Sequence, residues 1–160
     1  MPNRPNSRAL RAWLIVALWA MVVWALGGDS FSAGETSRIL RPLIEWLYPD
    51  VSSADLHRLL YTARKSAHVA EYALLAVLIL RALWLGSLRS LLGSLGLTLL
   101  LVAVMAAADE RRQSVSALRG GSGWDVLLDV SGGILAIALL LLFQHWQRRP
   151  LFRPDGGVAS

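Results

Sequence analysis

One short stretch of the sequence combines an ammonium group, an imidazole and a carboxylate at regular spacing. Lys65, His68 and Glu71 lie three residues apart within residues 64–72. At this spacing, residues of a helix share one face. The stretch opens a long apolar run, and ionisable groups so close to a membrane span are costly and usually face the protein interior. We therefore take these three side chains as a candidate functional site.

The residue types limit the chemistry of this site. A glutamate three residues after a histidine can orient the imidazole, so His68 and Glu71 are candidates for a catalytic acid/base pair. Lys65 can neutralise Glu71 or hold an anionic head group. The sequence has no cysteine, and the site has a single imidazole, so no metal site and no cofactor are predicted. No nucleophile is evident.

The composition is that of a membrane protein. Hydrophobic residues make up 55% of the 160 residues, and the mean hydropathy is +0.49. The net charge of +5 would suggest a nucleic-acid partner in a soluble protein. Here the arginines cluster at the ends of apolar runs, as topology requires, so the expected partner is the lipid bilayer and not a nucleic acid.

The apolar runs predict an all-α polytopic protein with four transmembrane helices. The predicted spans are residues 12–28, 54–85, 88–108 and 126–146. They define a membrane domain at 12–146, preceded by a basic arm at 1–11 and followed by a disordered tail at 147–160. A cleaved signal peptide is an alternative for the first run, because Ala25 and Gly27 have the small side chains of a cleavage site.

The polar segment 29–64 contains a further predicted helix. Ile39, Leu40, Leu43, Ile44 and Leu47 recur at helical spacing, with Ser37 as a possible N-cap and Pro49 as the stop. An amphipathic helix lying in the membrane interface fits this pattern, and a lid packed over the bundle is the alternative. The next helix is expected to start at Ser52 or Ser53 with Asp55, and its first turns should protrude from the membrane.

Basic residues predict the orientation. The two termini and the turn near Gly86 are expected on the same side, with a single acid, Asp155. That side carries the following arginines: Arg4, Arg8, Arg11, Arg81, Arg89, Arg148, Arg149 and Arg153. Both termini are therefore predicted to be cytoplasmic, and the 29–64 and 109–125 loops to face outward.

With four spans, three helix ends meet at the outer face. The following residues near these helix ends are therefore expected to lie close together: Lys65, His68, Glu71, Asp109, Glu110, Gln113, Arg119, Asp125 and Asp129. Three interpretations remain open for this cluster: a structural polar network, a binding site for a lipid-linked or peptide head group, and a catalytic site.

The order and spacing of these residues resemble the VanZ-like family of small bacterial membrane proteins, over roughly residues 35–140. The resemblance rests on Arg64-Lys65-x-x-His68-x-x-Glu71-Tyr72, Asp109-Glu110-x-x-Gln113, Arg119 with Asp125 six residues later, and Gly132-Gly133. It implies that Lys65, Tyr72, Asp109, Glu110, Gln113, Arg119 and Asp125 are site residues together with His68 and Glu71.

The resemblance also implies an envelope role in the bacterial cytoplasmic membrane. The founding member of the family is linked to teicoplanin resistance, so the expected ligand is lipid-linked or of the glycopeptide type. A membrane enzyme acting on lipid or cell-wall precursors, with His68 and Glu71 as acid and base, is the alternative.

Two positions depart from the family pattern. Val115 replaces an aromatic residue, and Asp129 replaces an asparagine. Because Asp125 and Asp129 are one helical turn apart, two like charges share a face. One of them must be protonated, or Arg119 or a cation must compensate.

Overall fold

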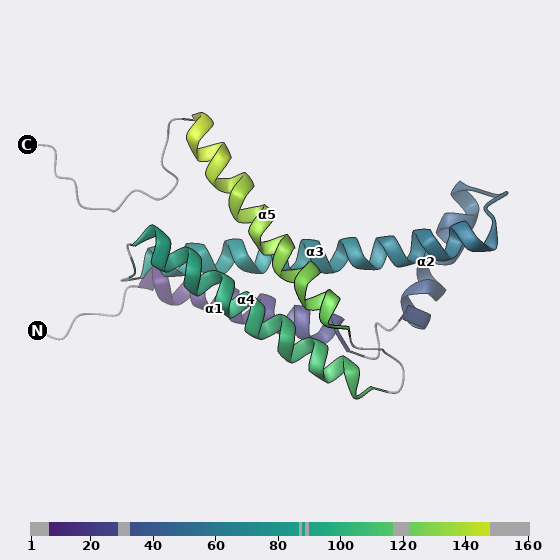
Figure 1. The fold of residues 1–160 in the computed structure, drawn as a ribbon, viewed down its shortest axis with the longest axis horizontal. Helices are drawn as coiled ribbons and strands as arrows, with labels where there is room; N and C mark the ends of the chain where they lie inside the picture. The colour runs from purple at the N-terminus through teal and green to yellow at the C-terminus, as the bar shows by residue number, and fades with distance from the viewer. Residues whose placement is uncertain (1–6, 29–32, 87, 89, 117–121, 148–160) are drawn as a thin grey trace, which may run out of the picture.

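The computed structural model consists of helices joined by short connections (Figure 1). It describes residues 7–28, 33–86, 88, 90–116 and 122–147, and this part of the chain contains no strand. The helices are α1 (Ser7–Leu26), α2 (Ala33–Leu47), α3 (Ser53–Leu85), α4 (Leu91–Ser114) and α5 (Gly123–Gln147). The predicted disordered tail and Arg119 lie outside the described residues.

Four of these helices are long and apolar enough to cross a membrane: α1, α3, α4 and α5. A span needs about 20 residues to cross a hydrocarbon core of about 30 Å, and these helices have 20 to 33. The prediction of an all-α fold with four transmembrane helices is thus confirmed, and the chain is a multi-pass membrane protein.

The helix ends differ from the predicted spans where charged residues continue a helix. α1 starts at Ser7, inside the segment predicted as a basic arm, because arginine and alanine are good helix formers. α4 runs on to Ser114, so Asp109, Glu110 and Gln113 are helical. The polar residues at the end of α4 therefore continue the same helix as its membrane span.

The start of α3 follows the predicted capping pattern. The Ser52 hydroxyl accepts a hydrogen bond from the Asp55 backbone N–H at 3.1 Å, which satisfies one of the free donors of the first turn. Ser37 caps nothing, because α2 begins four residues earlier at Ala33.

α3 is the central helix, since it packs against each of the other four helices. Its second half contains most of its buried residues, and Tyr72, Ala76 and Leu80 have no exposed surface. Its first turns extend beyond the bundle, as Figure 1 shows, which agrees with a helix of about 50 Å at 1.5 Å per residue.

α4 packs through a row of small and medium side chains. Ser94, Thr98, Val102 and Ala106 are buried and lie four residues apart, on one face. Gly96 does not belong to this face, because it is exposed and a Cβ built on it meets no atom within 4 Å. Hydroxyl and methyl groups therefore form this interface.

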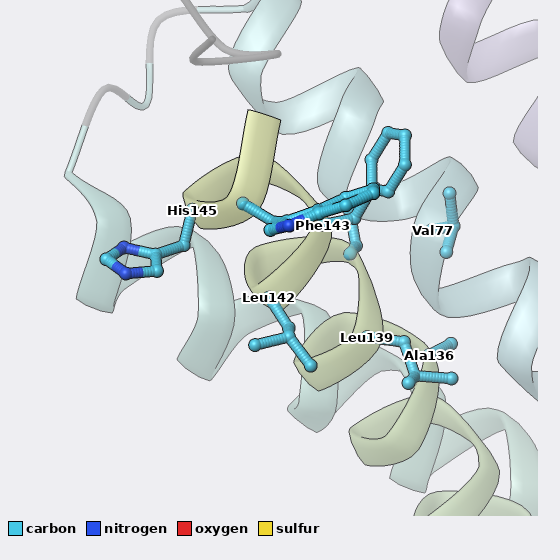
Figure 2. Close-up of a pocket in the computed structure, with 8 residues that line it drawn as sticks. Val77, Ala136, Leu139, Leu142, Phe143 and His145 are labelled. Atoms are coloured by element: carbon cyan, nitrogen blue, oxygen red, sulfur yellow. The ribbon is translucent and has the colours of Figure 1, made fainter. Parts of the chain in front are cut away.

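α5 crosses α3 in close contact and then diverges from it (Figure 1). At the crossing, a Cβ on Gly132 would lie 2.5 Å from the Val69 carbonyl oxygen, so the absence of a side chain lets the backbones touch. Beyond the crossing an apolar groove of about 730 Å³ opens, where Figure 2 shows Val77 opposite Leu139 and Phe143.

α2 packs against α3 beside its first turns, away from the crossing with α5 (Figure 1). Its apolar side chains remain largely exposed, including Ile39 at 73% and Trp46 at 76%. Such exposure suits a helix that lies in a membrane interface better than a lid packed over the bundle.

Candidate functional site: a polar cluster between α3, α4 and α5

Two ion pairs join α3 to α5. The Lys65 ammonium contacts the Asp125 carboxylate, and His68 Nδ1 lies 3.6 Å from Asp129 Oδ1. The two paired residues on α3 are three positions apart, and the two on α5 are four positions apart. Both spacings correspond to about one helical turn, so the second pair forms one turn further along both helices. All four side chains are mostly enclosed, with exposed fractions between 5% and 23%.

These ion pairs show how the negative charges of the two aspartates on one face of α5 are compensated. Asp125 takes its compensating charge from Lys65, and Asp129 faces His68. The carboxylate that the sequence suggested for orienting His68 was Glu71, on the same helix. The paired carboxylate belongs to Asp129, although Glu71 and Asp109 also interact electrostatically with His68.

α4 contributes a buried carboxylate. Asp109 is 2% exposed, and both of its oxygens accept hydrogen bonds within α4. Gln113 Nε2 donates to Oδ2 at 2.7 Å, and the Arg112 guanidinium donates to Oδ1 at 2.5 Å. Asp109 and Gln113 were predicted to be site residues, and the structure pairs them directly.

Arg112 extends this arrangement to α1. Its guanidinium donates to the Trp24 carbonyl oxygen at 2.7 Å and lies 4.3 Å from the centre of the Trp24 ring. The cation thus meets the free carbonyls and the negative end of the α1 dipole. Gly27 leaves room for this contact, since a Cβ there would overlap the Asp109 carboxylate.

Arg112, Trp24 and Gly27 were not among the site residues predicted from the sequence. A signal for Arg112 was present, because Asp109 and Arg112 have the i, i+3 spacing of a helical ion pair. Span counting also places the end of the first span beside the end of the third. No spacing within the sequence indicates which α1 residue Arg112 contacts.

Tyr72 lies at the centre of the cluster and has no exposed surface. The carboxylates of Asp109, Asp129 and Glu71 are close enough to act electrostatically on its phenol. The Tyr72 hydroxyl and Asp129 Oδ1 are buried and make no hydrogen bond to the described residues. The Glu71 backbone carbonyl accepts a hydrogen bond from Trp19 Nε1 at 3.0 Å, which fixes α3 against α1.

Glu110 closes the cluster near the bundle end. It accepts a hydrogen bond from the Ser122 backbone N–H, just before α5, and interacts electrostatically with Lys65 and Asp125. The cluster therefore has two layers. The layer at the bundle end holds Lys65, Glu110 and Asp125, and the inner layer holds His68, Glu71, Tyr72, Asp109, Gln113 and Asp129.

We call this two-layered set of side chains the polar cluster. It contains every predicted site residue except Arg119, which lies outside the described part of the chain. Among residues 7–28, 33–86, 88, 90–116 and 122–147, no group of three histidines, cysteines or carboxylates has a metal-binding arrangement. The apolar groove of Figure 2 contains none of the cluster residues.

The arrangement allows two kinds of chemistry. Unused hydrogen-bonding capacity on Tyr72 and Asp129 suits recognition of a polar group. A carboxylate beside His68 Nδ1 orients the imidazole and leaves Nε2 for proton transfer.

Comparison with known protein families shows which family this chain matches. A family model described as VanZ/LLP1 matches residues 11–144, which include α3, α4 and the whole polar cluster. Neither a curated protein nor a solved structure matches the chain significantly.

Proposed function

Because the chain belongs to the VanZ-like family, we propose that it is an envelope protein whose polar cluster binds the head group of a lipid-linked or glycopeptide-type ligand. We place it in the bacterial cytoplasmic membrane with both termini in the cytoplasm, so that the polar cluster lies near the outer leaflet. The excess of arginine at the opposite end of the bundle supports this orientation.

The observation that carries the proposal is the unused hydrogen-bonding capacity in the inner layer. The Tyr72 hydroxyl and Asp129 Oδ1 are both buried, and neither makes a hydrogen bond to the described residues, since the 3.6 Å between Asp129 Oδ1 and His68 Nδ1 is longer than a hydrogen bond. A buried polar group without a partner costs about 1–3 kcal/mol. A ligand that supplies the missing partners would recover that cost.

The same atoms favour a class of ligand. Asp129 is an acceptor when ionised, and the inner layer is rich in further carboxylates, Glu71 and Asp109 among them. Such a site suits a head group rich in donors, with hydroxyl, amide or ammonium groups. Sugars and peptides of envelope precursors and glycopeptides have these groups.

Binding to the purified protein tests the proposal. We expect wild-type protein in lipid nanodiscs to bind teicoplanin or a lipid-linked peptidoglycan precursor, as measured by titration calorimetry. Replacing Asp129 by Asn preserves shape but removes the charge, and His68→Ala removes its neighbour. Each should weaken binding about tenfold or more, since a hydrogen bond to a charged group contributes about 1.5–3 kcal/mol.

His57→Ala is the matched control, because His57 is exposed near the start of α3, about three turns from His68. It should bind like the wild type. The proposal fails if the wild type binds neither probe, or if all three variants bind equally. If His68→Ala and Asp129→Asn both fail to insert and fold while His57→Ala folds, the cluster is a structural network.

A membrane enzyme is a second candidate, favoured by the 3.6 Å contact between His68 Nδ1 and Asp129 Oδ1. In this reading His68 is the acid/base group, with Asp129 and Glu71 as its carboxylate neighbours. The same purified variants distinguish it from a binding protein. Wild-type protein incubated with extracted membrane lipids would release a product that His68→Ala does not, whereas a binding protein releases none.

A further inference from the structure

A second polar site lies at the opposite end of the bundle. An open cavity of about 460 Å³ between α1 and α3 is lined by three arginines: Arg8, Arg11 and Arg81. Its remaining lining residues are Ala12, Ile15, Leu78 and Leu85. The cavity has the size of a small-molecule site, and none of its lining residues is acidic.

The two helices present matching faces to this cavity. On α1, Arg8, Arg11 and Ile15 follow one another at three- and four-residue spacing. On α3, Leu78, Arg81 and Leu85 do the same. Because the helices run in opposite directions, both contribute arginine and apolar side chains to the same cavity.

Three guanidinium groups around one cavity repel one another, and an anion that binds between them lowers this repulsion. Guanidinium binds phosphate through parallel hydrogen bonds and keeps its charge at every physiological pH. The aliphatic stems and apolar walls continue into the membrane, where an acyl chain would follow. This combination of a cationic rim and an apolar wall matches an anionic phospholipid.

We infer that this cavity is a binding site for one anionic phospholipid, with its phosphate held by Arg8, Arg11 and Arg81. The site is separate from the polar cluster and goes beyond the proposed function. Orientation by positive charge needs only a sufficient number of basic residues on one side. Membrane orientation does not require arginines of two helices to line the same cavity. A phosphate-binding site does require this arrangement.

Bound lipid can be counted by native mass spectrometry. We expect wild-type protein released from nanodiscs of mixed phosphatidylglycerol and phosphatidylcholine to retain one phosphatidylglycerol. Arg81→Gln and Arg11→Gln should each reduce its apparent affinity about tenfold or more, since each removes a charge-assisted contact.

Arg58→Gln is the matched control. It removes the same charge from α3, but Arg58 is exposed at the far end of the helix, where it pairs with Asp55. Its retention of phosphatidylglycerol should equal that of the wild type. Soluble glycerol 3-phosphate at millimolar concentration distinguishes a lipid site from a phosphate site, because a lipid held through its acyl chain should not be displaced.

Three outcomes would overturn the inference. They are equal retention of both lipids by the wild type, an equal loss in Arg58→Gln, and displacement by glycerol 3-phosphate. Insertion and orientation of each variant are checked by cysteine labelling. If Arg81→Gln fails to insert, Arg11→Gln decides the outcome, because Arg11 is exposed near the start of α1.

Discussion

At the scale of residues, the main feature is the way opposite charges are matched across helices. Lys65 and Asp125 are 17% and 23% exposed, so the pair lies between a surface salt bridge and a buried one. A surface pair contributes little, but removing one partner of a buried pair leaves an uncompensated charge. The environment of the pair therefore decides how much each variant costs.

Replacing Lys65 by Met should lower the free energy of unfolding by about 1–3 kcal/mol, because the Asp125 carboxylate loses its cation. The double variant Lys65→Met/Asp125→Asn should recover part of this loss. Unfolding of the purified protein in detergent, followed by circular dichroism, measures both.

The matched comparison is Arg58→Met, since Arg58 and Asp55 form an exposed pair with exposed fractions of 81% and 57%. It should change stability by less than about 1 kcal/mol. Equal effects of Lys65→Met and Arg58→Met would contradict the assigned role of the Lys65–Asp125 pair.

At the scale of elements, the crossing of α3 and α5 decides whether the polar cluster forms. Both ion pairs require Lys65 and His68 to face α5 at contact distance. Gly132 permits this approach because it has no side chain. A Cβ at this position would lie 2.5 Å from the Val69 carbonyl oxygen, which is too close. Backbone packing thus sets the geometry of the side-chain contacts.

Gly132→Ala should therefore destabilise the protein by about 1–3 kcal/mol, the usual cost of overpacking. Alanine is the better helix former, so the change cannot be explained by helix propensity. Thermal unfolding in detergent is the measurement.

The same substitution in a different environment provides the control. Gly96→Ala lies inside α4 with no atom within 4 Å of its new methyl group, so it should be neutral or slightly stabilising. A similar loss in both variants would indicate that α3 and α5 do not touch at Gly132.

At the scale of the whole molecule, the even number of spans determines which helix ends meet. The start of α1 and the end of α5 lie toward the same end of the bundle (Figure 1). The two ends of the bundle differ in charge: paired acids and bases occupy one, and the arginine cavity lies near the other. This asymmetry supports the orientation that we propose.

Cysteine labelling tests that orientation, and the absence of native cysteine makes single-cysteine variants simple to interpret. Ala117→Cys, at a position between α4 and α5 in the sequence, should react with an impermeant maleimide in intact cells. Ser87→Cys, between α3 and α4, should react only after permeabilisation. The reverse pattern would place the polar cluster at the cytoplasmic face and contradict the proposed ligand class.

The sequence by itself determined the number of spans, because hydropathy over about 20 residues is a local property. It also indicated nearly all of the polar cluster, since an ionisable residue in an apolar helix stands out against its neighbours. Span counting then assigned Lys65, Asp109 and Asp125 to one end of the bundle.

The tertiary structure decided which of these residues are partners. His68 faces Asp129 on α5 and not its sequence neighbour alone, and Arg112 of α4 reaches the end of α1. These contacts depend on crossing angles and on close approach at glycines, which arise from packing between helices distant in sequence. Spacing within a helix contains no information about them.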